Sequence, residues 1–205
     1  MDIKLNFINQ SNDADNSQIV IFQPNVADNF GETAVAWIVI ENCGRGDNHP
    51  FVYPLSLSVG AGDADGNFTP HLPAINGQLF AMTRTTSGDE ISLAGKGTVA
   101  TEIQVENGLP DGAITAMVFK NDQLFAARTN LQPGQVASFQ FKPTILIGVV
   151  SQVTPGQILN SAILSSIKTE ISLLGLASAD IVMTGGGSGP DAKPFEFHLE
   201  NIVAA

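Results

Sequence analysis

Two histidines and two aspartates lie within one stretch of the chain that could bind a metal ion. His49 and His71 bracket this stretch, and Asp63 and Asp65 lie between them. Two histidines and one carboxylate can form the facial triad that holds non-haem iron and leaves positions for oxygen and substrate. Residues 47–71 therefore suggest one hypothesis, a metal-dependent enzyme such as a non-haem iron oxygenase. It requires the chain to turn at Pro54, because one long strand would place His49 and His71 at opposite ends of a sheet.

The same aspartates allow a second metal hypothesis. Asp63 and Asp65 are two residues apart in "GDADGN", where Gly66 can turn the backbone, and calcium loops use oxygen ligands with such a spacing. The third acidic position and the distal Glu of an EF-hand are absent. Because Asp, Gly and Asn also tolerate the dihedral angles of a tight turn, the loop is interpreted first as a plain turn and second as a weak calcium site.

The stretch "ENCGRGDNHPF" contains further reactive residue types. Cys43 is the only cysteine, so it cannot form a disulfide within the chain, and no second Cys or His has the spacing of a zinc site. A nearby Arg could lower the pKa of this thiol, but an inert cysteine is the preferred interpretation. Arg45-Gly46-Asp47 matches a cell-adhesion tripeptide by three residues only. We therefore interpret the stretch as a polar loop between two strands.

Other candidate motifs are weaker. His198 alternates with Glu196 and Glu200 on a predicted strand and is interpreted as an exposed residue, with a role as third metal ligand as the alternative. Ser165 and Lys168 fit S-x-x-K, but the companion motifs of that nucleophile are absent. The glycine-rich stretch 185–190 runs into Pro190 and lacks the strand–turn–helix context of a phosphate loop. The sequence therefore predicts no catalytic residue, and calcium or iron are the cofactors it suggests.

Composition and charge narrow the classes of partner. Nine basic and twenty acidic residues give a net charge of −11, which repels phosphate backbones and anionic headgroups and makes nucleic acid a poor partner. The first residues alternate like a strand and do not resemble a secretory signal. No run has the length and apolarity of a membrane span. We expect a soluble cytoplasmic protein.

Short apolar runs separated by Gly and Pro predict an all-β fold. Ile3, Leu5 and Phe7 alternate with polar residues, and the hairpins expected near Ser87–Asp89 and Asn121–Asp122 have apolar arms. Ten or more short strands favour an antiparallel β-sandwich, immunoglobulin-like or jelly-roll-like. The turn rhythm of residues 105–141 resembles that of many immunoglobulin-like modules, which implies the same fold. We expect one domain, residues 1–205, with a candidate subdomain division near 95–101.

Two turns share the sequence Pro-Gly-Gln, at residues 133–135 and 155–157. Pro followed by Gly predicts a type II turn at both places. Nothing else recurs at a fixed period, so a solenoid is not predicted. Residues 156–168 could instead form a short helix, with Thr154 as N-cap and Pro155 in the first turn. A strand is favoured there because the surrounding elements are all β.

The segment from Thr144 to Gly189 has few charges: Lys168, Glu170 and Asp180 are its only charged residues. Uncharged strands at a sheet edge or face suit self-association. The preferred hypothesis is therefore a non-catalytic binding or assembly protein that uses this low-charge surface for self-association or a protein partner. A pore former that inserts the same segment into a membrane is a further alternative, which the absence of interfacial aromatic residues disfavours.

Overall fold

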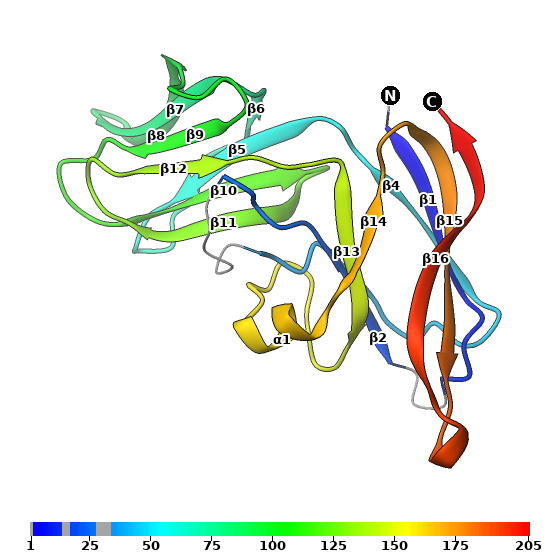
Figure 1. Ribbon diagram of the computed structural model, residues 1–205. Coiled ribbons are helices and arrows are strands. Elements are labelled where there is room, and N and C mark those ends of the chain that lie inside the picture. The colour runs from blue at the N-terminus through cyan, green and yellow to red at the C-terminus, as the bar shows by residue number, and fades with distance from the viewer. Residues whose placement is uncertain (1, 14–16, 28–33) are drawn as a thin grey trace. The chain divides into compact units, whose positions relative to one another are not determined.

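The computed structural model describes residues 2–13, 17–27 and 34–205. These residues form sixteen strands in four sheets, one α-helix and one short 3-10 helix. The predicted all-β sandwich class is confirmed. The chain divides into two compact units, each made of two four-stranded sheets (Figure 1). None of the boundaries between the units falls near 95–101, and the organisation as one domain stays a prediction.

Unit 1 comprises the described residues of 1–23, 36–55 and 143–205. One sheet has the strand order β16-β15-β1-β4 and the other β14-β13-β2-β3. β1 and β15 are parallel, whereas the other neighbours in these sheets are antiparallel. The strands are β1 (Ile3–Asn9), β2 (Gln18–Phe22), β3 (Ile38–Ile40), β4 (Asn48–Tyr53), β13 (Thr144–Val150), β14 (Thr169–Ser172), β15 (Leu176–Gly186) and β16 (Lys193–Ala204).

Unit 2 comprises the described residues of 24–35 and 56–142. Its sheets have the orders β11-β10-β5-β6 and β12-β9-β7-β8. β7 and β9 are parallel, and the other neighbours are antiparallel. The strands are β5 (Leu57–Gly62), β6 (Leu72–Ala74), β7 (Gln78–Thr85), β8 (Gly88–Lys96), β9 (Ile103–Asn107), β10 (Ile114–Lys120), β11 (Gln123–Leu131) and β12 (Val136–Phe139).

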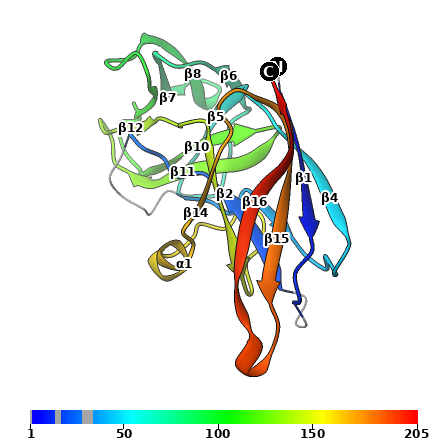
Figure 2. The same ribbon diagram turned by 45° about the vertical axis from the view of Figure 1, so that its right-hand side comes forward.

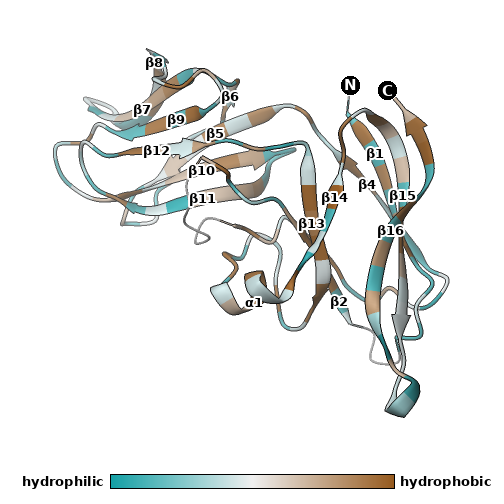
Figure 3. Ribbon diagram, viewed as in Figure 1, coloured by the Kyte–Doolittle hydropathy of each residue, from teal (hydrophilic) through white to brown (hydrophobic). Residues whose placement is uncertain are grey.

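Each unit buries the inner faces of its two sheets against each other. In unit 1, Ile3, Leu5 and Phe7 of β1 are buried, as their alternation predicts. Trp37 packs edge-on against Tyr53, with ring centroids 5.7 Å apart. In unit 2, the core includes side chains from both sheets, among them Val59, Phe80, Ile103, Val118 and Phe139. Figure 3 shows the hydrophobic residues that run along strands such as β13.

The turns agree with several predictions. Asn121 and Asp122 form the tip of the β10–β11 hairpin with φ angles of +49° and +61°, as a two-residue turn of type I′ requires. Gly134 and Gly156 have φ angles of +78° and +81°, which confirms the type II turn geometry at both Pro-Gly-Gln sequences. The β7–β8 hairpin has its tip at 86–87, because Gly88 already pairs with Thr85.

The preference for a strand at 156–168 is wrong, and the alternative of one short helix holds. Helix α1 spans Ser161–Ser166, and its N-cap is Asn160, whose side chain accepts a hydrogen bond from the N–H of Ile163. Thr154 belongs instead to the preceding type II turn, where its N–H donates to the Oε1 of Gln157 at 3.1 Å. The N-cap therefore lies six residues after the predicted one, because Pro155 and Gly156 are used by the turn.

Candidate functional site

The predicted calcium loop is a self-contained turn in unit 2 between β5 and β6. Oδ1 of Asp63 accepts hydrogen bonds from the N–H groups of Asp65 and Asn67, both at 2.9 Å. Oδ2 of Asp63 accepts a third from the Asn67 amide at 2.7 Å. These bonds lower the pKa of Asp63, and the side-chain bond from Asn67 contributes most to the lowering. Both oxygens of this carboxylate therefore accept hydrogen bonds from within the turn, as the plain-turn interpretation expects.

The histidines of the iron hypothesis lie in different units. His71 is in unit 2, where its ring stacks on Phe119 with centroids 3.7 Å apart and its Nδ1 lies 3.5 Å from Asp122. His49 is an exposed residue of β4 in unit 1. Among residues 2–13, 17–27 and 34–205, no three His, Cys, Asp or Glu side chains lie close enough together to hold a metal ion. The metal site predicted at His49, His71, Asp63 and Asp65 stays a prediction, and the described residues do not form such a ligand group.

The stretch around Cys43 forms a polar turn between β3 and β4. Cys43 is buried, and this burial, followed by the charge of Asp47, raises the pKa of its thiol. Arg45 donates from Nη1 to the Asn12 side chain at 2.9 Å, and Asp47 accepts from the N–H of Gly44 at 3.0 Å. The acidic and basic side chains of the adhesion-like tripeptide are thus engaged within the protein, and the thiol is protonated at neutral pH.

His198 and the nucleophile motif also have local explanations. His198 is exposed on β16, and its Nε2 lies 3.0 Å from a carboxylate oxygen of Glu200. Ser165 is in α1 and donates from Oγ to the carbonyl of Ala162 at 2.9 Å. Lys168 lies beyond the C-cap residue Ile167, where the backbone is extended, so it is not one helical turn from Ser165. The glycine-rich stretch 185–190 ends β15 and begins the connection from β15 to β16.

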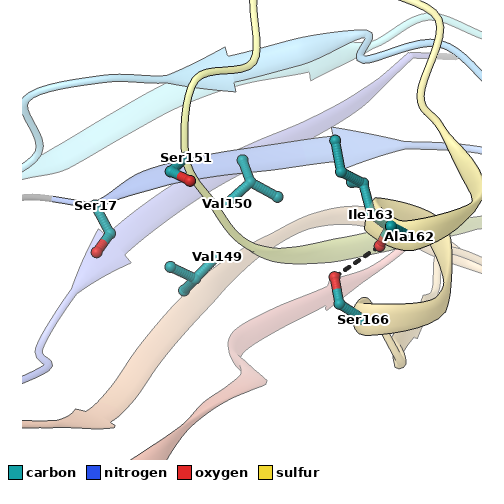
Figure 4. A pocket seen from close by; sticks show the side chains of 7 residues that line it. All are labelled: Ser17, Val149, Val150, Ser151, Ala162, Ile163 and Ser166. Atoms are coloured by element: carbon teal, nitrogen blue, oxygen red, sulfur yellow. Dashed lines mark hydrogen bonds between the residues drawn. The ribbon is translucent and has the colours of Figure 1, made fainter.

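A pocket of about 470 Å³ lies beside α1 in unit 1 (Figure 4). Three of its lining residues are serines and the other four are aliphatic. They are the residue before β2, the last two residues of β13 with the residue after it, and three residues of α1: Ser17, Val149, Val150, Ser151, Ala162, Ile163 and Ser166. The hydroxyl of Ser166 is held by the carbonyl of Ile163 at 2.7 Å, which Figure 4 draws.

This lining offers hydroxyl groups and aliphatic carbon, and it carries no formal charge. Such a surface can accept an apolar side chain and make a few neutral hydrogen bonds, and its groups do not titrate near neutral pH. The pocket thus fits binding better than acid–base chemistry. The low-charge segment 144–189, selected from the sequence, contains six of the seven lining residues. Ser17 was missed because nothing in the sequence indicates that β2 lies beside β13.

A second pocket, of about 360 Å³, lies in unit 2 and includes Asp63 and Asp89. Its carboxylates have partners: Asp63 holds its own turn, and Asp89 binds Arg84 through two contacts of 2.9 and 3.2 Å. Because these oxygens are already paired, this pocket is a weaker candidate site than the uncharged one beside α1.

No helix in the described part of the chain is long and apolar enough to cross a membrane. Comparisons of the chain with family models, with curated proteins and with solved structures gave no significant match.

Proposed function

We propose that the protein acts by non-catalytic binding or assembly, through the low-charge surface of residues 144–189. The observation that carries this proposal is the uncharged pocket beside α1. Its wall includes the exposed Ala162 and the half-buried Ile163, and Ile158 nearby along the loop is 39% exposed. A concave apolar patch with a few hydroxyl groups resembles the centre of a protein interface, where an apolar side chain of the partner is buried.

Helix α1 supports the proposal in a second way. None of its six residues is buried and none is charged. A helix this short has little stability of its own in water. Its position is fixed by the Asn160 cap and by the buried side chains of Leu159 and Ile167 on either side. The loop therefore presents an uncharged, anchored surface, and a second copy of the chain is the partner to test first. We also propose that the protein is cytoplasmic and does not bind nucleic acid.

The test is the mass in solution over a wide concentration range. We expect wild-type protein to exceed its 21.5 kDa monomer mass as concentration rises. Ala162→Glu places a charge at the pocket wall and should weaken association by about tenfold or more, because a buried charge without a partner is costly.

The matched control is Ala94→Glu, the same change at an exposed position of β8 in unit 2. It alters the net charge equally and should leave association unchanged. A protein that stays at the monomer mass at every concentration would contradict self-association. Equal effects of the two substitutions would show that net charge, and not this surface, controls assembly.

A further inference from the structure

The two units have the same strand topology, although their sequences show no obvious repeat. Each strand of unit 1 corresponds to the strand eight places away in the numbering: β1 to β9, β2 to β10, β3 to β11, β4 to β12, β13 to β5, β14 to β6, β15 to β7 and β16 to β8. This replacement turns β16-β15-β1-β4 into β8-β7-β9-β12, and β14-β13-β2-β3 into β6-β5-β10-β11. These are the two sheets of unit 2. The one parallel pair of each unit, β1–β15 and β7–β9, also corresponds.

The correspondence extends to a buried asparagine at the end of the parallel pair. Asn9 pairs with Met183, and Asn107 pairs with Met82. In both units the next N–H donates to the methionine carbonyl at 2.9 Å. The side-chain amide of Asn9 donates to the carbonyl of Cys43 at 2.7 Å, and that of Asn107 donates to the carbonyl of Leu131 at 2.8 Å. Each Oδ1 accepts from the N–H two residues further on, at 2.9 and 3.1 Å.

Asn9 and Asn107 each bind a four-residue turn, and the two turns have matching hydrogen bonds. The turns are residues 44–47 and 132–135. In each turn the N–H of the last residue donates to the carbonyl of the first at 3.0 Å. The side chain of that last residue accepts from the N–H of the first, at 3.0 Å for Asp47 and 2.9 Å for Gln135. Gly46 and Gly134 hold φ angles of +88° and +78°, and their N–H groups donate at 2.7 Å to the carbonyls of the two asparagines.

Aromatic packing follows the same register. Residues 37–55 and 125–143 align without a gap if Gly46 is matched to Gly134. This alignment matches Trp37 with Phe125 and Tyr53 with Phe141, and both pairs pack edge-on, with centroids 5.7 and 4.9 Å apart. It also matches Asn42 with Asn130, whose φ angles are +54° and +56°. Agreement in strand order, hydrogen bonds, dihedral angles and ring packing is not expected of two unrelated sandwiches.

We infer that the chain consists of two copies of one eight-stranded repeat and that the copies exchange halves. The first repeat carries β1–β8 and the second β9–β16, joined through residues 97–102. Unit 1 takes β1–β4 from the first repeat and β13–β16 from the second. Unit 2 takes β5–β8 from the first and β9–β12 from the second. The partner that each repeat requires is therefore a second copy of the same repeat.

The two ends of the described chain fit this arrangement. Lys4 pairs with Ser178, and Ala204 pairs with Leu176, so the two ends flank the same end of β15. Figure 2 shows them side by side. Two strand spacings separate them by roughly 10 Å. In unit 2 the corresponding ends of β8 and β9 flank β7 and are joined by residues 97–102.

The exchange is tested by cutting the full chain between the repeats. Ala100 and Thr101 are exposed, so a protease site placed between them should be cleaved in the folded protein. Because each unit needs strands from both repeats, the two fragments should stay together at the mass of the uncut chain and separate only in denaturant. Fragments that separate under native conditions would overturn the exchange.

The equivalence of the repeats is tested in the turn at 44–47. Arg45 corresponds to Pro133, so Arg45→Pro should change the melting temperature by no more than about 4 °C. Gly46→Pro is the matched control, because proline cannot adopt the φ of +88° and removes the N–H that binds Asn9. It should lower the melting temperature by roughly 6–12 °C. Equal losses in the two variants, or a larger loss for Arg45→Pro, would overturn the equivalence.

Discussion

Replacing either buried asparagine by alanine should destabilise the protein by a similar amount. Asn9 makes three side-chain hydrogen bonds, to Cys43 and to the N–H and hydroxyl of Ser11. Asn107 also makes three, to Gly112, Leu131 and Leu109. At about 1 kcal/mol for each lost bond, the expected cost is about 3 kcal/mol for either Asn9→Ala or Asn107→Ala. For a chain of this length, that corresponds to a loss of roughly 6–12 °C in melting temperature.

The assay is urea unfolding followed by circular dichroism and by tryptophan fluorescence. The only tryptophan, Trp37, lies in unit 1 and reports on the unit that contains Asn9, whereas circular dichroism reports on both units. Asn48→Ala is the control, because Asn48 is an exposed residue at the start of β4 and should change stability by less than about 0.5 kcal/mol. A cost below about 1 kcal/mol at Asn9 or Asn107 would refute the structural role given to the pair.

Three further predictions concern titration, reactivity and metal content. Burial raises the pKa of Tyr53 to about 12, so the native state favours its neutral form, and stability should fall as pH rises from about 10 to 12, by about 2–3 kcal/mol in all; Tyr53→Phe should remove this dependence in pH-jump unfolding experiments. Cys43 should react slowly with a thiol reagent at pH 7 in the native state and rapidly in urea, and fast native labelling would contradict its burial. Protein purified without chelators should hold no stoichiometric calcium or iron by elemental analysis, because no three His, Cys, Asp or Glu side chains of the described residues gather at one place. One equivalent of iron would revive the oxygenase hypothesis and call for alanine at His49 and His71.

Local structure was predictable where the sequence carries a local physical signal. The alternation of Ile3, Leu5 and Phe7 predicts the buried face of β1, because side chains in a strand alternate between faces. Asn121–Asp122 predicts a hairpin tip, since both residues tolerate positive φ. The start of the helix was placed too early because Pro155 suits the start of a helix and the second position of a type II turn equally well.

The global arrangement was not predictable for an equally physical reason. β1 pairs with β15, whose residues are more than 170 positions away, and no local pattern encodes this choice. The repeat is hidden because a sandwich strand requires only apolar alternation, which many residues satisfy. Between 37–55 and 125–143 only three of nineteen residues are identical: Asn42 with Asn130, Gly46 with Gly134, and Phe51 with Phe139. Two of these pairs hold positive φ angles, where few residue types are tolerated.

The repeats also show where unit 1 carries more than the fold needs. Residues 63–71 join β5 to β6 with nine residues, whereas the equivalent connection from β13 to β14 takes eighteen, residues 151–168. The longer connection adds α1 and is fixed to the core by three buried side chains: Val153, Leu159 and Ile167. A loop that served only to join two strands would need neither a helix nor these anchors, since the shorter one closes the same topology. The extra residues instead build one wall of the uncharged pocket. One of the differences in connection length between the two units thus falls at the surface proposed for assembly.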